Sequence, residues 1–226
     1  MNKISKMALY GKCKFKLLEK MEPKFLRKYR KNKLVNNKFS IVSNNCYAGW
    51  VYRYFDLPYE TPTVGLFIMP ADYIKLIYNL KHYFIEFSLI FIEPNKLKYK
   101  KEISAKDSRF GSYPIGLLDD IEIHFLHYKS QEEAYSKWMK RLKRFNWNNI
   151  VIKFSDQNGC TVNDIKKFSE LNNYKKICFV AKKEMCLDEN IIYVNGFKKD
   201  GYMVDDTWFN NKYVDLIKFL NKGSKN

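Results

Sequence analysis

The sequence predicts a three-layer α/β protein with a mostly parallel sheet, helices on both faces of that sheet, and a basic N-terminal arm. Strand-like and helix-like segments alternate along most of the chain, which is the order expected when helices join parallel strands. Short apolar segments such as NIVIKF and KICFVA fit strands that are covered on both faces. Thirteen basic and two acidic residues among positions 1–38 contribute +11 to the formal net charge of +17.

Each element follows from a local pattern of apolar residues and helix-start signals. Pro70 fits the first turn of a helix, where its missing N–H is not needed. Ser130 fits an N-cap, with Glu133 completing a capping box. The polar, basic segment 96–110 is predicted to be a loop. Strands are predicted at 39–43, 63–69, 88–93, 121–128, 150–154, 177–181 and 191–194, and helices at 46–55, 70–84, 130–144, 161–171 and 210–220.

The 226 residues, 46% of them hydrophobic, are enough for one domain with a substantial core. We expect the arm at 1–37, partly helical, and a single α/β domain at 38–226. The arm lacks the uninterrupted apolar core of a secretory signal, and no run of 18 apolar residues indicates a membrane span. Its basic charge predicts an anionic partner, which is a membrane surface, a nucleic acid or an acidic polymer. A solvated extension and docking on the domain are equal alternatives.

Five cysteines without C-x-x-C spacing indicate reduced thiols rather than a disulfide framework or a zinc site. The expected location is therefore the cytoplasm, including the inner face of the cell membrane.

Polar residues follow three of the predicted strands, at the edge where α/β sheets bind ligands. They are Ser43, Asn44, Asn45 and Cys46 after the first strand, Asp156, Gln157 and Asn158 after IVIKF, and Lys182 after ICFVA. If these strands are parallel neighbours, the three clusters meet and form a ligand site. The helices that begin there also offer N-termini that can hold a phosphate or carboxylate, and ordinary capping is the simpler alternative.

Cys46 lies in the first turn of a predicted helix, where a thiol pKa can be lowered for nucleophilic attack. It needs a base nearby, and the chain has only three histidines. A structural role for Cys46 is the competing interpretation, and Ser43 is a rival nucleophile. The turn lacks the flanking glycines of a G-x-S-x-G elbow.

Strand alternation in LLDDIEIHFLHY places Asp120, Glu122 and His124 on one face. Such a group can supply general acid and base catalysis, or it can be an exposed strand face. It matches no metal-ligand spacing, so no metal is predicted. His127 falls on the apolar face and is predicted to be a core residue.

Aromatic and basic residues interleave in WMKRLKRFNW, at 138–147. This pattern is compatible with nucleic-acid binding but also with an ordinary amphipathic helix, and no reader motif supports the first interpretation.

Three strings resemble a bacterial family known as domain of unknown function 1919, over about 38–181, with an extension to the end of the chain as an alternative and the basic arm outside the resemblance. They are FSIVSNNCYAGWVYRYFDLPYETPTVGLFIMPADYIKLIYNL, YPIGLLDDIEIHFLHYKSQEEAYSKWMKRLKRFNWNN and IVIKFSDQNGCT. Members are often labelled exopolysaccharide or capsule biosynthesis proteins. The resemblance implies an α/β fold and a role in surface-glycan assembly, without an established reaction.

Two classes of function follow. The first is a transferase that moves an acyl, glycosyl or phosphate-containing group onto a glycan or lipid-linked sugar. Residues 43–46 would bind or attack the donor, Asp120, Glu122 and His124 would move protons, and residues 156–158 would position the acceptor. The second is a non-catalytic protein that binds a glycan or a partner of the same machinery. The sequence indicates neither a cofactor nor an oligomeric state.

Overall fold

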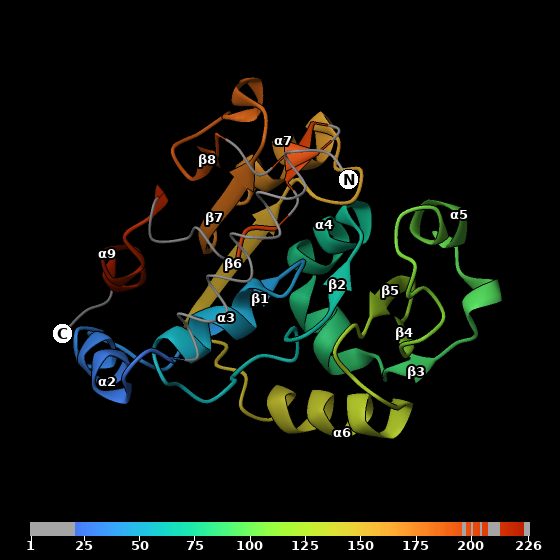
Figure 1. The fold of residues 1–226 in the computed structure, drawn as a ribbon, viewed down its shortest axis with the longest axis horizontal. Coiled ribbons are helices and arrows are strands. Elements are labelled where there is room, and N and C mark those ends of the chain that lie inside the picture. The colour runs from blue at the N-terminus through green and yellow to red at the C-terminus, as the bar shows by residue number, and fades with distance from the viewer. Residues whose placement is uncertain (1–20, 196–197, 200, 204, 208–212, 224–226) are drawn as a thin grey trace.

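The main sheet is parallel and combines strands from both halves of the chain (Figure 1). The computed structural model describes residues 21–195, 198–199, 201–203, 205–207 and 213–223. The strand order is β1-β6-β7-β8, and Ser43 at the end of β1 lies opposite Lys153 of β6. The four strands are β1 (Ser40–Ser43), β6 (Ile150–Ser155), β7 (Lys175–Val180) and β8 (Ile191–Tyr193).

Alternate residues of these strands enter two apolar cores, one on each face of the parallel sheet. Ile41 and Val151 belong to one core, whereas Val42 and Ile152 belong to the other. This double burial explains why the strand sequences are almost continuously apolar. Helices contribute to both cores. The first core includes residues of α3 (Tyr47–Tyr54) and α9 (Leu216–Asn221), and the second those of α4 (Pro70–Tyr78) and α7 (Val162–Glu170).

A second four-stranded sheet is antiparallel, so the prediction of one mostly parallel sheet was wrong for the middle of the chain. The predicted strands at 63–69, 88–93 and 121–128 each contribute a strand to this sheet instead of joining β1. The strand β4 was not predicted. It forms a tight hairpin with β5, and a two-residue connection allows only antiparallel pairing. In order, the strands are β2 (Phe67–Ile68), β5 (Ile121–His124), β4 (Ile115–Leu118) and β3 (Ile90–Phe91).

Helix boundaries differ from the predictions in three places. The helix predicted at 210–220 begins only at Leu216, after the N-cap Asp215, and positions 210–212 lie outside the described residues. The helix that starts at Pro70 ends at Tyr78, because Asn79 leaves the helical region at φ −134°, and a π-helical turn follows at His82–Glu86. The predicted loop at 96–110 contains a short helix. The remaining elements are α2 (Lys24–Asn32), α5 (Lys100–Ser104), α6 (Gln131–Leu142), the 3-10 turns Pro94–Lys96 and Lys183–Met185, and the strand pair β9 (Lys198–Lys199) and β10 (Tyr202–Met203).

The N-caps follow the sequence signals closely. The Ser130 hydroxyl accepts a hydrogen bond from the Glu133 N–H at 3.2 Å, as predicted. The Glu133 carboxylate accepts from Lys129 N–H at 2.7 Å instead of closing a capping box. A reciprocal capping box is found at α7, between Thr161 and Asp164.

The described part of the arm, 21–37, is partly helical, since α2 covers nine of its residues. Leu34, just after α2, is buried in the same core as α3, so the arm is attached to the domain. The division into an arm and a single domain stays a prediction. Among the described residues, no helix combines the length and apolar character needed to cross a bilayer. The cysteines in this part of the chain are free thiols, at positions 46, 160, 178 and 186.

Candidate functional site

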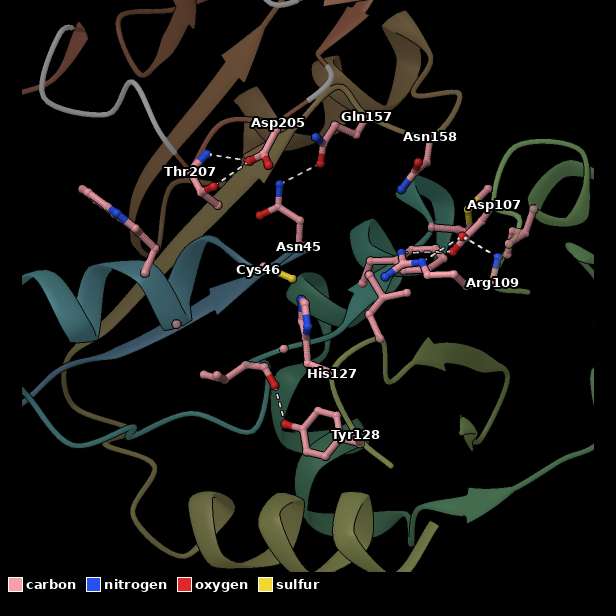
Figure 2. Close-up of a pocket in the computed structure, with 18 of the residues that line it drawn as sticks. Asn45, Cys46, Asp107, Arg109, His127, Tyr128, Gln157, Asn158, Asp205 and Thr207 are labelled. Carbon is pink, nitrogen blue, oxygen red and sulfur yellow. Dashed lines mark hydrogen bonds and ion pairs between the residues drawn. The ribbon is translucent and has the colours of Figure 1, made fainter. Parts of the chain in front are cut away.

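A pocket of about 730 Å³ opens where β1 and β6 end, between the parallel sheet and the antiparallel one (Figure 2). This is the edge at which the sequence predicted a ligand site, and the volume is in the range of small-molecule sites. The floor includes Asn45 and Cys46 from the turn after β1, and Gln157 and Asn158 from the turn after β6. Four residues predicted to bind or attack a ligand therefore line one cavity.

Asn45 is the centre of a buried hydrogen-bond network. Its amide N–H₂ donates to Gln157 Oε1 at 2.7 Å and to both carboxylate oxygens of Asp206, at 3.0 and 3.1 Å. Its carbonyl oxygen accepts from Ser43 Oγ and Lys153 Nζ, both at 3.0 Å. Because every polar group of this side chain is engaged, Asn45 has a fixed position at the pocket floor, and Ser43 lies behind it as a support.

Lys153 and Asp206 form an ion pair in the interior, and neither side chain is exposed. Burial lowers the pKa of the Lys153 ammonium, while the adjacent Asp206 opposes this shift. The ammonium also lies 4.8 Å from the centre of the Tyr47 ring. The pair connects the middle of the parallel sheet to the C-terminal segment, and it thereby holds Asp205 and Thr207 at the pocket wall.

Asp156 has a similar anchoring function. Its carboxylate accepts hydrogen bonds from the backbone N–H groups of Ala181 at 2.7 Å and Met203 at 2.9 Å. Burial raises the pKa of this carboxyl group, and the two N–H donors oppose the rise. Asp156 is not among the residues that line the cavity, so its contacts support the pocket wall rather than a ligand.

Asn44 connects the two sheets. Its side-chain N–H₂ donates to the Ser155 carbonyl at 3.0 Å, and its own backbone carbonyl accepts from the Ile68 N–H at 3.0 Å. Lys182 lies over the Tyr202 ring, 5.2 Å from its centre, and is outside the cavity lining. Of the predicted ligand-binding residues, Asn45, Gln157 and Asn158 thus face the cavity, while Ser43, Asn44, Asp156 and Lys182 do not.

Cys46 faces the pocket from the N-terminus of α3, as the sequence predicted. Its sulfur lies 3.9 Å from the Leu66 carbonyl oxygen. Burial raises the pKa of this thiol to about 12, and the nearby carboxylates of Asp205 and Asp206 add to the shift. The group is therefore a neutral thiol near pH 7, and nucleophilic attack requires a base that removes its proton.

His127 is the histidine that lines the pocket, and the prediction that it is a core residue was wrong. Its side chain is exposed, and Figure 2 shows the imidazole directed toward the sulfur of Cys46. Its backbone N–H donates to the Gly65 carbonyl at 3.1 Å. Gly65 has a φ of 75°, and a Cβ there would lie 3.3 Å from the His127 Cβ. The prediction assumed that the alternation of strand faces continues to His127. The strand β5 ends at His124, so this alternation does not apply to His127.

Asp120, Glu122 and His124 are outside this cavity. Asp120 pairs with Lys75 and accepts from the Tyr83 hydroxyl at 2.9 Å. It lies in the hairpin turn and not on the strand, so the three groups do not form one face.

Glu122 and His124 are both buried, and His124 stacks on Phe67 with ring centres 4.4 Å apart. Phe67 itself lines the pocket, so His124 lies one side chain behind the wall. Burial lowers the pKa of His124 to about 4, which leaves the imidazole neutral at pH 7. The nearest Glu122 oxygen is 3.9 Å from Nε2, too far for a hydrogen bond.

The pocket walls carry an excess of cationic side chains together with aromatic rings. Arg141 is buried, and its guanidinium donates to the Val64 carbonyl at 3.3 Å and lies 5.0 Å from the centre of the Tyr59 ring. Arg109 pairs with Asp107 at 3.1 Å. The cationic residues in the lining are Arg53, Lys106, Arg109, Lys137 and Arg141, the acidic ones are Glu102, Asp107 and Asp205, and the larger aromatic ones are Trp50, Tyr59, Phe67 and Tyr128.

Sequence reasoning missed His127, Lys153, Asp206 and the cationic walls. Lys153 had a visible signal, because a lysine in the middle of the apolar segment IVIKF is costly to bury without a partner. Asp206 had no comparable signal, since its partners Asn45 and Lys153 are 161 and 53 positions away.

The fold and this site define the class: a mixed α/β protein with a ligand-sized pocket at the carboxyl edge of its parallel sheet. The chain belongs to the family described as Domain of unknown function (DUF1919), whose family model matches residues 17–221. The match continues past 181 almost to the C-terminus, which is the longer of the two ranges predicted, and it includes about half of the basic arm, so the prediction that the arm lies outside the family resemblance was wrong. An uncharacterized protein of Haemophilus influenzae is 29% identical over 200 residues, which cover 87% of this chain and 89% of that protein.

Proposed function

We propose that this protein is an acyltransferase of cell-surface polysaccharide assembly, with Cys46 as the nucleophile and His127 as its general base. The observation that carries the proposal is that this cysteine and this imidazole line the same pocket, at the edge of the sheet where ligands bind. Cysteine favours acyl transfer over the other predicted transfers, because its covalent intermediate is a thioester that an alcohol can attack.

The raised pKa of Cys46 determines how such a reaction would start. His127 would take the thiol proton while the sulfur attacks the acyl carbonyl of a thioester donor. The donor thiol would leave with that proton, and the acyl group would remain on Cys46. In the second half, His127 would deprotonate a sugar hydroxyl of the acceptor, the sugar oxygen would attack the acyl carbon, and the proton would return to the Cys46 sulfur.

The pocket walls suit substrates that combine phosphate groups with sugar rings. Arginine and lysine bind phosphate groups, and aromatic faces stack on apolar sugar surfaces. The five cationic residues against three acidic ones favour an anionic ligand such as coenzyme A or a phosphate-linked sugar. The role in surface polysaccharides rests on the resemblance of the three quoted sequence strings to the family, and the pocket chemistry is compatible with it.

Binding of acetyl-coenzyme A by the full chain, measured by calorimetry, and transfer of labelled acetyl groups to a bacterial polysaccharide test this proposal. Cys46→Ala and His127→Gln should each lower the rate of acetyl transfer at least about a hundredfold, and both variants should still bind the donor. Cys186→Ala and His82→Gln are matched controls outside the pocket lining and should retain full transfer. Equal activity of Cys46→Ala and the unmodified chain would reject the mechanism.

A non-catalytic glycan-binding protein is the second candidate. The neutral thiol of Cys46 and the position of Asp120, Glu122 and His124 outside the pocket favour it. In that case the unmodified chain would bind a phosphorylated glycan without transferring any group, and Arg141→Gln would weaken binding, whereas Cys46→Ala would not.

A further inference from the structure

The helix α2 of the basic arm carries its apolar side chains on the outside. Phe25 is 68% exposed, Tyr29 is 58% exposed and Leu26 is 39% exposed. No residue of α2 is buried. A helix that only packs on its domain turns its apolar face inward, so this arrangement requires another explanation.

Polar contacts fix this orientation. The Arg30 guanidinium donates to the Tyr54 carbonyl of α3 at 3.0 Å and lies 3.7 Å from the centre of the Tyr54 ring. Arg30 also makes two hydrogen bonds of 2.6 Å with the Glu22 carboxylate, and Arg27 adds one of 3.2 Å. The inner face of α2 is therefore ionic, and the aromatic side chains point away from the domain as a consequence of these anchors.

Lysines surround the exposed apolar residues. Lys24 and Lys28 lie on the same outer side of α2, and Lys33 lies 5.2 Å from the centre of the Tyr29 ring. The acidic residue beside them, Glu22, is already paired with both arginines. Residues 21–33 contain four lysines and two arginines against this one glutamate. The local charge is thus strongly positive and complementary to an anionic surface.

We propose that the outer face of α2 binds the surface of an anionic phospholipid bilayer. A bilayer interface accepts single projecting aromatic and aliphatic side chains while lysines contact the lipid phosphates. Nucleic acid would satisfy the lysines but not Phe25 and Leu26. The bilayer therefore accounts for both the apolar and the cationic side chains. This proposal does not depend on the acyltransferase proposal, since it concerns a different surface.

Co-sedimentation of the full chain with vesicles tests the proposal. The protein should bind vesicles that contain 30% phosphatidylglycerol with an affinity about tenfold or more higher than vesicles of phosphatidylcholine alone, because several lysines contact the anionic lipid. Salt at 0.5 M should weaken the binding to the anionic vesicles. Failure to bind the anionic vesicles, or equal binding to both kinds, would overturn the proposal.

Two pairs of variants assign the binding to α2. Phe25→Ser combined with Tyr29→Ser should weaken vesicle binding about tenfold, whereas Tyr135→Ser combined with Ile85→Ser, at exposed apolar positions elsewhere, should not. Lys24→Ala combined with Lys28→Ala should weaken it about tenfold or more, and Lys140→Ala combined with Lys143→Ala on the exposed side of α6 should have a smaller effect.

All of these substitutions are at exposed side chains, so circular dichroism should show folded variants. If the α2 variants and their controls lose the same amount of vesicle binding, the binding depends on overall charge or on nonspecific hydrophobic contact, and the assignment to α2 is overturned. Tighter binding to an oligonucleotide than to the vesicles, with Phe25 and Tyr29 irrelevant, would favour nucleic acid instead.

Discussion

Single buried polar residues define the pocket floor, because each one links segments that are distant in the sequence. Asn45 is the clearest example, with partners on β1, on β6 and in the C-terminal segment. A buried polar group is costly without a hydrogen-bond partner, so the removal of one side chain should destabilise the groups that it pairs with. Residue-scale predictions therefore concern the buried ion pair and the buried histidine.

We expect Lys153→Met to lower the free energy of unfolding by about 3–5 kcal/mol, because it leaves the Asp206 carboxylate buried without its cation. Urea denaturation at pH 7 measures this change. The matched control is Lys75→Met, which also breaks a lysine–aspartate pair. Both side chains of that pair are 49% exposed, so we expect a loss of less than about 1 kcal/mol.

A second variant separates the charge effect from misfolding. In Lys153→Met/Asp206→Leu the unpaired charge is gone, and we expect part of the lost stability to return. If Lys153→Met and Lys75→Met lower the free energy of unfolding equally, then breaking the buried pair costs no more stability than breaking the exposed one.

The buried imidazole of His124 predicts a loss of stability in acid. Its pKa is lowered to about 4 in the folded chain from an ordinary value of 6.5, so between these pH values the unfolded chain binds a proton that the folded chain does not. The stability contribution is complete above pH 6.5 and decreases as the pH falls toward 4, by at most about 3 kcal/mol.

The measurement is the difference in unfolding free energy between pH 7.5 and pH 5. In His124→Leu this difference should shrink by about 2 kcal/mol. His82→Gln is the control, because the His82 side chain is 43% exposed, and it should leave the difference unchanged. An unchanged pH dependence in His124→Leu would mean that other groups cause the acid sensitivity.

At the scale of elements, helix starts were predictable because capping is local. Ser130 and Thr161 both cap the helices that follow them, and each bond spans three residues. Strand pairing was less predictable. The segment around Ile121 was correctly recognised as a strand, but its partner β4 and its antiparallel direction depend on a hairpin turn at Asp119, where φ is 54°. Local sequence does not specify which sheet a short apolar strand joins.

For α6 we expect Ser130→Ala to lower the unfolding free energy by about 1 kcal/mol, because the Glu133 N–H loses its acceptor. Ser136→Ala is the matched control on the same helix, at an exposed interior position where alanine is the better helix former. It should leave stability unchanged or raise it slightly. Urea unfolding of both variants measures the contrast, and equal losses would argue against a specific cap.

At the scale of the whole molecule, the pocket exists because two sheets of different type meet. The parallel sheet supplies the floor through Asn45 and Cys46, and the segment beside the antiparallel sheet supplies His127. The connection between the sheets is direct, since the Asn44 carbonyl accepts from the Ile68 N–H. The Tyr73 hydroxyl of α4 adds contacts with the Val42 and Lys153 carbonyls of the parallel sheet. His127 thus comes to the pocket that Cys46 lines from a segment just after β5, which sequence order does not place there.

The sequence by itself determined the α/β class, the approximate positions of the strands at 39–43, 150–154, 177–181 and 191–194, the N-caps Ser130 and Thr161, and the charge of the arm. These features depend on local periodicity, on residue conformational preferences and on composition, which can all be read within a few residues. Only the tertiary structure decided that His127 and not His124 faces Cys46, that Lys153 pairs with Asp206, and that α2 turns its aromatic side chains outward. These facts depend on long-range packing and on the desolvation of charges, because a buried polar group is stable only where a distant partner completes it.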